Sequence, residues 1–400
     1  MRKIENIIIL AGGKSTRFWP LADKNTFMFC GKPLIVHQAE KFLPLTHHLW
    51  IVTGQHNKDK ISHLVASYKN VKIVTQKHEG QASALLAVSS LRGEVLVVNN
   101  GDIFDEQVIF DAIFARRNRA KLILATKEMD AYFPGGYLVV KGDIVTSIIE
   151  KPNPDKLPSS MVRLVADYFS HFDEFVSILQ KHTGSAKDGA YEDCLNSYIA
   201  QNGGIYTKYS GYWHFLKYPW HVLDVQSFFL SQLKSYRGKN VLIDKTATVE
   251  GNVYFEDGVS IYEYAKVSGP AYIGKNTVVG NYSLVRESSV GQGSMIGSSS
   301  EVARSYCGEN VWLHRNYVGD SVIDGNVLFG AEAVCANFRF DAGKVHSMIK
   351  GIRVDTQRHK LGAMIGSDTK IGVNASLMPG IKINPRSRIM PNSSVTKDVI

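Results

Sequence analysis

The chain has 400 residues, which is more than one compact core accommodates, so we expect two domains. Hydrophobic residues make up 44% and charged residues 21% of the sequence, as in soluble globular proteins, and no apolar run reaches the length of a membrane span. The formal net charge is +9, but no basic run with interleaved aromatic residues appears. We therefore expect small anionic substrates as partners, and neither nucleic acid nor a membrane.

Cysteine usage and the N-terminus indicate where the protein works. The four cysteines are scattered and form no CxxC pair, which argues against structural disulfides and a zinc site and fits a reducing compartment. Residues 1–6 lead into a strand and not into a signal peptide. We expect a cytoplasmic protein.

The first predicted element is a strand that ends in a glycine turn. The apolar run Ile7–Leu10 is followed by Ala11, Gly12 and Gly13, as in a buried parallel strand. Glycine lets backbone N–H groups approach a polyphosphate closely. Cations follow at Lys14, Arg17 and Lys24, and a second lysine-glycine unit is present at Gly31-Lys32-Pro33. The pattern predicts a nucleoside triphosphate bound by its phosphates at Leu10, Ala11, Gly12 and Gly13. The alternative is an ordinary strand–turn–helix with a solvated basic turn.

This stretch resembles the signature of the sugar-1-phosphate nucleotidylyltransferases. In that family the arginine and first lysine stabilise charge while a sugar phosphate attacks the α-phosphate and pyrophosphate leaves. The resemblance assigns these catalytic roles to Arg17 and Lys24. The family usually has glycine where this chain has Ser15, whose hydroxyl can donate to phosphate.

The rest of the first half alternates strand and helix patterns, which predicts a doubly wound, Rossmann-like α/β domain with ligands at the strand ends. The alternation also favours a parallel sheet. Predicted strands cover residues 49–53, 71–75, 94–99 and 121–126, and amphipathic helices cover residues 58–68 and 81–90.

Two short motifs follow these strands. Gln76 and Gly80 resemble the family's base-reading glutamine and the glycine that leads the next helix; a glutamine amide can pair with a pyrimidine edge. Gln81 stands where the family usually has threonine or serine. Asp102 resembles the aspartate that holds Mg²⁺ against the triphosphate. Its alternative role is to cap a helix over residues 106–117, which Asp105 serves equally well.

The sugar-binding part of the family resembles the stretches around Gly136 and around Glu150 and Lys151, on a predicted hairpin of residues 137–140 and 145–149. The alternative for Glu150 and Lys151 is a solvated loop pair. Two family features are absent. Residues 162–167 replace an Asn-Thr-Gly-like sugar contact, and the Trp-x-Asp metal carboxylate is missing, so that Asp224 or His221 substitutes for it or the ligand is lost.

Residues 218–237 predict one amphipathic helix closed by Gly238. We therefore place a nucleotidylyltransferase-like domain at 1–217, a linker helix at 218–240 and a second domain at 241–400. In that domain apolar residues recur every six positions, from Val249 to Val285 and from Ile365 to Val395. This period predicts a parallel β-helix. It resembles the hexapeptide-repeat acyltransferases, whose coils are left-handed and which form homotrimers.

A basic insertion, residues 337–361, interrupts the repeat, and we expect it to receive phosphates of coenzyme A or of the sugar, or to serve as a trimer contact. Upstream of it, His314, Tyr317 and Asp320 lie in a stretch that resembles the His-x-x-Tyr-x-Gly-Asp motif of the bifunctional uridylyltransferase/acetyltransferase family. The resemblance implies that His314 is the general base for N-acetyl transfer from acetyl-CoA. It implies substrate contacts at Arg286, Glu301, Tyr317 and Asn337. A family lysine is Ala303 here, and phosphate binding can shift to Arg304.

The resemblance spans nearly the whole chain. It implies a sugar nucleotide enzyme that uses UTP, Mg²⁺ and acetyl-CoA on sugar phosphates. One alternative is that only one half is active, the first being a non-catalytic sensor or scaffold. Another is guanylyl or thymidylyl transfer, because residues 18–21 resemble the mannose-1-phosphate guanylyltransferases.

Overall fold

A computed structural model describes residues 2–182 and 189–400. The chain divides into two compact units, each considered by itself below. Unit 1 comprises Met1–Lys14 and Leu34–Phe215, and unit 2 comprises Ser15–Pro33 and Leu216–Ile400. The segment Ser15–Pro33, which carries Arg17 and Lys24, therefore belongs to the same unit as the second half of the chain. The second stretch of unit 2 begins at Leu216, whereas the expected division at residue 217 placed the Ser15–Pro33 segment in the first domain.

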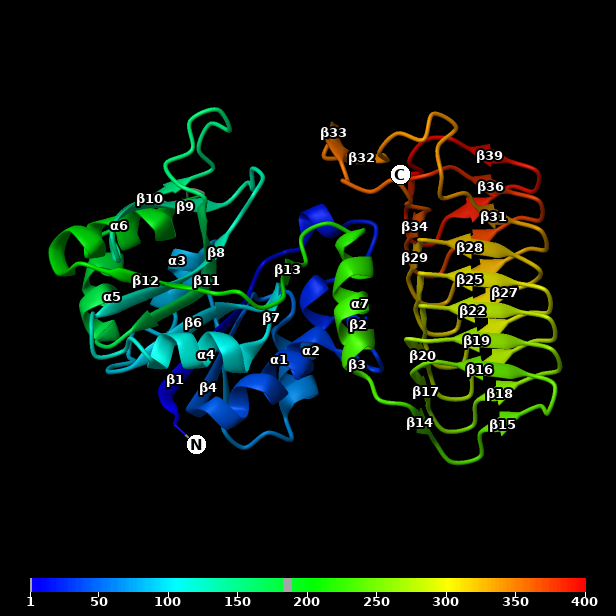
Figure 1. Cartoon of the computed structure of the whole chain (residues 1–400), viewed down its shortest axis with the longest axis horizontal. Helices are drawn as coiled ribbons and strands as arrows, with labels where there is room; N and C mark the ends of the chain where they lie inside the picture. Colours follow the sequence, from blue (N-terminus) through cyan, green and yellow to red (C-terminus); the bar gives the residue numbers. More distant parts are fainter. Residues whose placement is uncertain (1, 183–188) are drawn as a thin grey trace. The chain divides into compact units, whose positions relative to one another are not determined.

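Unit 1 is built on a nine-stranded sheet of order β5-β4-β1-β6-β11-β8-β12-β10-β9 (Figure 1). The strands β5, β4, β1 and β6 run parallel, as predicted. The strand β11 pairs antiparallel with both β6 and β8, so the sheet is mixed and not wholly parallel. The bounds are β1 Ile4–Ala11, β4 Thr46–Thr53, β5 Val71–Thr75, β6 Val95–Asn99, β8 Leu122–Glu128, β9 Gly136–Lys141, β10 Ile144–Glu150, β11 Met161–Phe169 and β12 Ile205–Lys208.

Helices cover both faces of this sheet. Along β1, Ile7 and Ile9 enter one hydrophobic core while Ile8 and Leu10 enter the other, as the two-residue period of a strand requires. The predicted helices end up to four residues early, because their last turns close through i→i−3 bonds such as Ser89 N to Leu86 O. The bounds are α1 Leu34–Phe42, α2 Lys58–Val65, α3 Gln81–Leu86, α4 Glu106–Phe114, α5 Phe172–Lys181 and α6 Ala190–Asn202.

Most of unit 2 is a left-handed parallel β-helix of three eight-stranded sheets (Figure 1). The first sheet contains β14 (Tyr236–Arg237), β17 (Val253–Phe255), β20 (Ala271–Ile273), β23 (Ser289–Val290), β26 (Tyr306–Cys307), β29 (Val322–Ile323), β34 (Met364–Ile365) and β37 (Lys382–Ile383). The second contains β15 (Leu242–Ile243), β18 (Ser260–Ile261), β21 (Val278–Val279), β24 (Met295–Ile296), β27 (Trp312–Leu313), β30 (Leu328–Phe329), β35 (Lys370–Ile371) and β38 (Arg388–Ile389). The third contains β16 (Thr248–Glu250), β19 (Lys266–Ser268), β22 (Leu284–Arg286), β25 (Glu301–Ala303), β28 (Tyr317–Gly319), β31 (Val334–Cys335), β36 (Ser376–Leu377) and β39 (Ser394–Val395).

The hexapeptide residues form the core of this β-helix. Ile273, Val279 and Val285 are fully buried. Val290 and Cys307 are also buried, although each follows the preceding core residue, Val285 or Val302, after five positions and not six. The insertion leaves and rejoins the coils at one point, since Leu361 N donates to Asn337 O. It contains a hairpin of β32 (His346–Ile349) and β33 (Ile352–Asp355).

The connecting helix α7 spans His221–Gln232 and is shorter than the predicted helix over residues 218–237. The backbone is extended at Leu233, and Tyr236 and Arg237 already pair in parallel with the next coil. The last residues of the predicted helix therefore form the first strand of the β-helix, β14, and not a helical turn. No helix within residues 2–182 and 189–400 has the length and apolarity to cross a membrane.

Candidate active sites

The glycine turn after β1 faces Gln76. A Cβ placed on Gly12 would lie 2.2 Å from Gln76 Oε1, so only glycine leaves room for this side chain. Gln76 follows β5, and its backbone N donates to Thr53 O at the end of β4. The predicted phosphate-binding turn and the predicted base-reading residue thus lie in contact at the carboxyl ends of β1 and β5, the two parallel strands on either side of β4.

Asn57 fastens this turn and was not among the predicted site residues. Its Nδ2 donates to Ala11 O at 2.9 Å, and its Oδ1 accepts from Gly54 N at 3.0 Å. The side chain is buried, so both amide groups need partners. A lone asparagine after a strand carries no sequence signal for this task, because the contact joins residues 46 positions apart.

The loop after Gln76 is held by its own side chains. Gln76 Nε2 donates to His78 O at 2.9 Å, and Ser83 Oγ accepts from His78 N. Gly80 has a φ of +101° and immediately precedes α3, which Gln81 begins. Lys14 forms an exposed ion pair with Glu79, 2.5 Å long. This ion pair therefore links the glycine turn after β1 to the connection that carries Gln76 and Gly80.

Asp102 lies where β6 ends, beside the end of β1. Asn100 N donates to Leu10 O at 3.0 Å, and Gln38 Nε2 donates to Asp102 O at 2.9 Å. Asp102 is buried and starts β7 (Asp102–Phe104), which pairs with β13 (Trp213–Phe215). The N-cap of α4 is Asp105, whose Oδ1 accepts from Val108 N. Asp102 is thus not the cap.

The donor set around Asp102 fits Mg²⁺ bound together with a substrate. In the described part of the chain, no three His, Cys, Asp or Glu side chains come together in a metal-binding group. Mg²⁺ commonly takes one or two carboxylates and completes its shell with phosphate oxygens and waters. A single buried aspartate at the glycine turn suits that mode and does not suit a metal cage made by protein alone.

The predicted sugar-binding residues meet on the hairpin of β9 and β10. Gly136 and Glu150 are register partners, and a Cβ on Gly136 would lie 3.2 Å from Glu150 Oε2. Lys151 has a left-handed backbone, and its Nζ lies 3.5 Å from Glu150 Oε1. Burial, followed by the negative charge of Glu192, raises the pKa of Glu150. The structure therefore brings Gly136, Glu150 and Lys151 together.

A buried charge network lies behind Gly136 and was not predicted. Arg163 is ion-paired with Asp167 at 2.6 Å and with Glu192, and Tyr191 OH donates to Asp167 at 2.8 Å. Both Arg163 and Asp167 lie on β11, at the two ends of an irregularity in its pairing with β8. These residues occupy the stretch where the family's Asn-Thr-Gly-like contact was missing. The charges of Arg163 and Asp167 interrupt the apolar pattern of β11, so the sequence did not predict this strand.

Arg17 and Lys24 lie in the Ser15–Pro33 segment of unit 2. Ser15 has a φ of +56°, and its Oγ donates to Asp23 Oδ1 at 2.8 Å and accepts from Lys24 N at 3.3 Å. The hydroxyl that we expected to reach phosphate is thus engaged within the loop, where it holds the backbone of Lys24. Arg17 is exposed on a short turn, η1 (Thr16–Phe18), and Lys24 begins η2 (Lys24–Thr26).

The two candidates for the missing metal carboxylate have other partners. Asp224 forms an ion pair with Arg358 of the insertion. His221 Nδ1 faces the backbone N–H groups of Lys217 and Tyr218, at 3.3 and 3.4 Å. Both side chains are therefore engaged within unit 2.

The predicted acetyltransferase residues gather on the third sheet of the β-helix. Glu301 and Tyr317 are register partners on β25 and β28, and Arg286 on β22 donates to Glu301 Oε1 at 2.8 Å. Parallel stacking of coils places these side chains one above another, although they are about one coil apart in sequence.

Asp320 is the centre of this cluster. It accepts two hydrogen bonds from Arg304, at 2.8 and 2.6 Å, and one from Asn337 Nδ2 at 2.5 Å. Asn337 also donates to Tyr317 OH at 3.2 Å. A Cβ on Gly319 would lie 2.5 Å from the Tyr317 hydroxyl, so glycine is needed there. Arg304, which we expected to replace a phosphate-binding lysine, is engaged with Asp320.

His314 lies at the corner between β27 and β28, three residues before Tyr317. Its backbone N donates to Asn316 Oδ1, which fixes the corner, while the residue itself is exposed. An exposed histidine at this corner is accessible from solvent.

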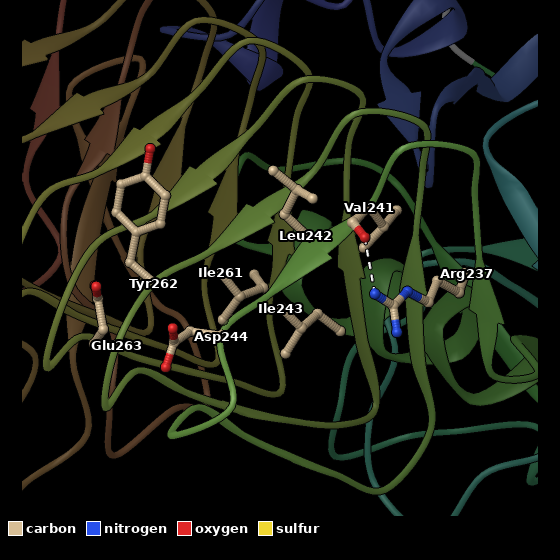
Figure 2. Close-up of a pocket in the computed structure, with 8 residues that line it drawn as sticks. All are labelled: Arg237, Val241, Leu242, Ile243, Asp244, Ile261, Tyr262 and Glu263. Atoms are coloured by element: carbon tan, nitrogen blue, oxygen red, sulfur yellow. Dashed lines mark hydrogen bonds between the residues drawn. The ribbon is translucent and has the colours of Figure 1, made fainter.

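Part of the basic charge of the insertion is internally neutralised. Arg339 pairs with Asp341, Lys344 with Asp355 and Arg358 with Asp224. A separate hollow lies at the first coils of the β-helix, and Figure 2 shows Arg237, one of its lining residues, donating to Val241 O. It is lined by none of the predicted site residues; its walls are Arg237, Val241, Leu242, Ile243, Asp244, Ile261, Tyr262 and Glu263.

Known proteins resemble both halves. The family model described as nucleotidyl transferase matches residues 6–214. The bifunctional protein GlmU of Methanococcus vannielii is 30% identical and that of Methanococcus maripaludis 32% identical, each over 98% of this chain and 95% of its own length. A bifunctional sugar-1-phosphate nucleotidylyltransferase/acetyltransferase of Sulfurisphaera tokodaii is 30% identical over 98% of this chain and 97% of its own length.

A solved UDP-glucose pyrophosphorylase in complex with UDP-glucose has a TM-score of 0.50 at 17% identity, covering 57% of this chain and 99% of that one, which supports the fold alone. The sequence matches extend from the glycine turn through the last coils of the β-helix. The chain therefore belongs to the nucleotidyl transferase family, in its branch of two-part proteins that carry a C-terminal β-helix.

Proposed function

We propose that this protein makes an activated amino sugar in two reactions, N-acetyl transfer from acetyl-CoA and nucleotidyl transfer from UTP. The observation that carries the proposal is the contact of Gly12 with Gln76 at the carboxyl ends of β1 and β5, where a glycine turn and an amide meet. Parallel α/β sheets bind ligands at this edge, and the glycine turn leaves backbone N–H groups accessible to phosphate.

In the nucleotidyl step, an oxygen of the sugar 1-phosphate attacks the α-phosphorus of UTP, and the bond to pyrophosphate breaks. Arg17 and Lys24 balance the charge that develops on the phosphates. Asp102 would hold Mg²⁺, which, when bound, neutralises triphosphate charge. Gln76 reads the base, while Gly136, Glu150 and Lys151 bind the sugar.

In the acetyl step, the amine nitrogen of an aminosugar phosphate attacks the thioester carbonyl, and the coenzyme A thiolate leaves. His314 takes the proton from the attacking amine. Tyr317 and Asn337, tied to Asp320, contact the sugar, and the Arg286–Glu301 pair lies beside them. The cluster supports this role because it groups donors and acceptors on the third sheet, three residues along the chain from the exposed His314.

The test is to measure pyrophosphate release with UTP and N-acetylglucosamine 1-phosphate, and thiol release with acetyl-CoA and glucosamine 1-phosphate. Lys24→Met should abolish the first signal and leave the second. His314→Asn should do the opposite. Absence of pyrophosphate release with every sugar phosphate and nucleotide tried, GTP and dTTP included, would reject the nucleotidyl half.

A second candidate function is favoured by the partners of Asp224 and His221. Both are engaged elsewhere in unit 2, which motivates a first half that binds sugar nucleotides without turnover. Isothermal titration with UTP and UDP-N-acetylglucosamine separates the two: binding without pyrophosphate release favours the sensor.

We further propose a homotrimer and a cytoplasmic location. The four free cysteines, of which Cys194, Cys307 and Cys335 are buried, suit a reducing compartment. Light scattering coupled to gel filtration measures the mass: three chains support the trimer, and a monomer rejects it.

A further inference from the structure

The segment that carries Arg17 and Lys24 is anchored on the β-helix. Its short strands β2 (Met28–Phe29) and β3 (Lys32–Pro33) lie beside α7 (Figure 1). Phe29 stacks on Phe229 of α7 with ring centroids 5.2 Å apart, and Phe27 packs on Tyr306 of the β-helix at 4.8 Å. Phe27, Phe29 and Tyr306 are each at most 5% exposed, so this is an interior contact and not a surface one.

Trp19, two residues after Arg17, is held by a single late coil of the β-helix. Its Nε1 donates to Asn384 Oδ1 at 2.9 Å, and the Lys382 ammonium lies 5.0 Å from the ring centroid. Trp19 and Asn384 are 365 residues apart in sequence. A tryptophan N–H that meets a side-chain oxygen, with a cation on the ring face, fixes both the position and the rotation of the indole.

Lys382 is a poor choice for testing the Trp19 contact by mutation, because its side chain also has other partners. Its side chain is almost fully buried, and it pairs with Asp398 at 2.9 Å and donates to Met348 O in the β32 strand of the insertion. Replacing it would disturb the insertion as well as Trp19. Asn384, by contrast, contacts Trp19 through one side-chain oxygen.

The backbone at the start of the segment packs loosely: a Cβ on Gly13 would meet no atom within 4 Å, and Arg17 is exposed on its short turn. Catalytic cations need placement to within a fraction of an ångström, and a misplacement of about 1 Å costs up to about 100-fold in rate. The contacts with Asn384, Lys382 and Tyr306 hold this segment on the β-helix of its own unit.

We propose that Asn384, through Trp19, is a positioning residue for nucleotidyl transfer, although it lies in the β-helix that carries the acetyltransferase residues. This inference rests on the proposed function. On this proposal the position of the Ser15–Pro33 segment depends on a late coil of the β-helix. A fragment of the first 217 residues would therefore lack the contact that positions Arg17.

The test uses the full chain and four variants: Asn384→Ala, Asn384→Asp, Trp19→Phe and the double variant Trp19→Phe/Asn384→Ala. Met390→Ala, an exposed residue on a late part of the β-helix, is the matched control. We expect Asn384→Ala and Trp19→Phe each to lower kcat for pyrophosphate release at least tenfold, with thiol release and the unfolding temperature unchanged. Asn384→Asp keeps the acceptor oxygen and should retain activity, and the double variant should be no slower than either single variant.

Docking of the segment has a readout that does not need nucleotidyl activity. Cys30 lies in the segment and is the one cysteine of the four that is not fully buried. Burial raises its pKa to about 12. Asn384→Ala should speed its reaction with Ellman's reagent in the native protein.

The outcomes separate the two proposals. If the wild type releases no pyrophosphate, the proposed function fails, and the Cys30 labelling rate still decides whether Asn384 docks the segment. If the wild type is active but Asn384→Ala matches it in both kcat and labelling rate, or if the two single effects multiply in the double variant, the positioning role is wrong.

Discussion

Arg304 and Asp320 form a two-pronged ion pair on adjacent coils of the β-helix, with Nε–Oδ1 and NH2–Oδ2 distances of 2.8 and 2.6 Å. The same carboxylate accepts from Asn337, which in turn donates to Tyr317. The hydrogen bonds that Arg304 donates to Asp320 raise the pKa of Arg304, so the guanidinium stays charged. Arg304 therefore holds Asp320 in place for Asn337 and Tyr317 and is itself engaged by this carboxylate.

Arg304→Lys should slow acetyl transfer, because an ammonium cannot satisfy both carboxylate oxygens with the geometry of a guanidinium. We expect kcat/KM for thiol release to fall about tenfold, equivalent to about 1.4 kcal/mol. Arg315→Lys is the control, since that ion pair with Glu332 is solvent-exposed. Equal activity of both variants would show that the Asn337–Tyr317 pair holds its place without Arg304.

Gly12→Ala should weaken nucleotide binding. The new Cβ would lie 2.2 Å from Gln76 Oε1, and the side chain of Gln76 must move away to make room. We expect KM for UTP to rise by an order of magnitude or so, with the fold retained because Gln76 is a flexible side chain. The measurement is pyrophosphate release at varied UTP. Gly325→Ala, which meets nothing closer than 3.4 Å, should behave as wild type.

Asp102→Asn should abolish the dependence of pyrophosphate release on Mg²⁺ concentration along with most of the activity, since an amide is a weaker Mg²⁺ ligand than a carboxylate. We expect a loss of about 100-fold or more, and no change in thiol release. Asp105→Asn is the comparison: asparagine still caps α4, so both activities should persist. Full activity of Asp102→Asn at low Mg²⁺ would rule out the metal role.

Asp167 should give the protein an unusual pH dependence of stability. Burial raises its pKa to about 6, against an ordinary value of 3.8, with Arg163 opposing the rise. Between pH 4 and 6 the native state then binds more protons than the unfolded state, so its contribution to the free energy of unfolding falls as pH rises through that window.

Asp167→Asn removes this titration. Its free energy of unfolding relative to wild type should therefore increase from pH 4 to pH 7, as measured by urea unfolding with matched m-values. If the free energy of unfolding of the variant, relative to wild type, instead decreases as pH rises, the ion pair with Arg163 stabilises the charged carboxylate by more than its burial costs. Asp173→Asn, on α5, serves as a control for general charge effects.

The sequence by itself determined the elements whose signals are local and periodic. The strand over Val71–Thr75 lies where it was predicted, and the six-residue period gave the β-helix, because one apolar residue per side must fill its core. The motifs placed Gly12 near Gln76 and Tyr317 near Asn337 by resemblance. Strand β11 was missed because Arg163 and Asp167 hide its apolar pattern, and their charges are tolerated only because they pair with one another in the interior.

Tertiary structure alone decided which partners each side chain found. Asp105, and not Asp102, caps α4; Arg304 and Asp224 are held by Asp320 and Arg358; and Trp19 meets Asn384 across 365 residues. No periodicity or spacing encodes such contacts, because they depend on how coils far apart in the chain stack. The fold determines which groups lie within hydrogen-bonding or ion-pairing distance of a charged or aromatic side chain. A side chain that is engaged in this way is less available to contact a substrate.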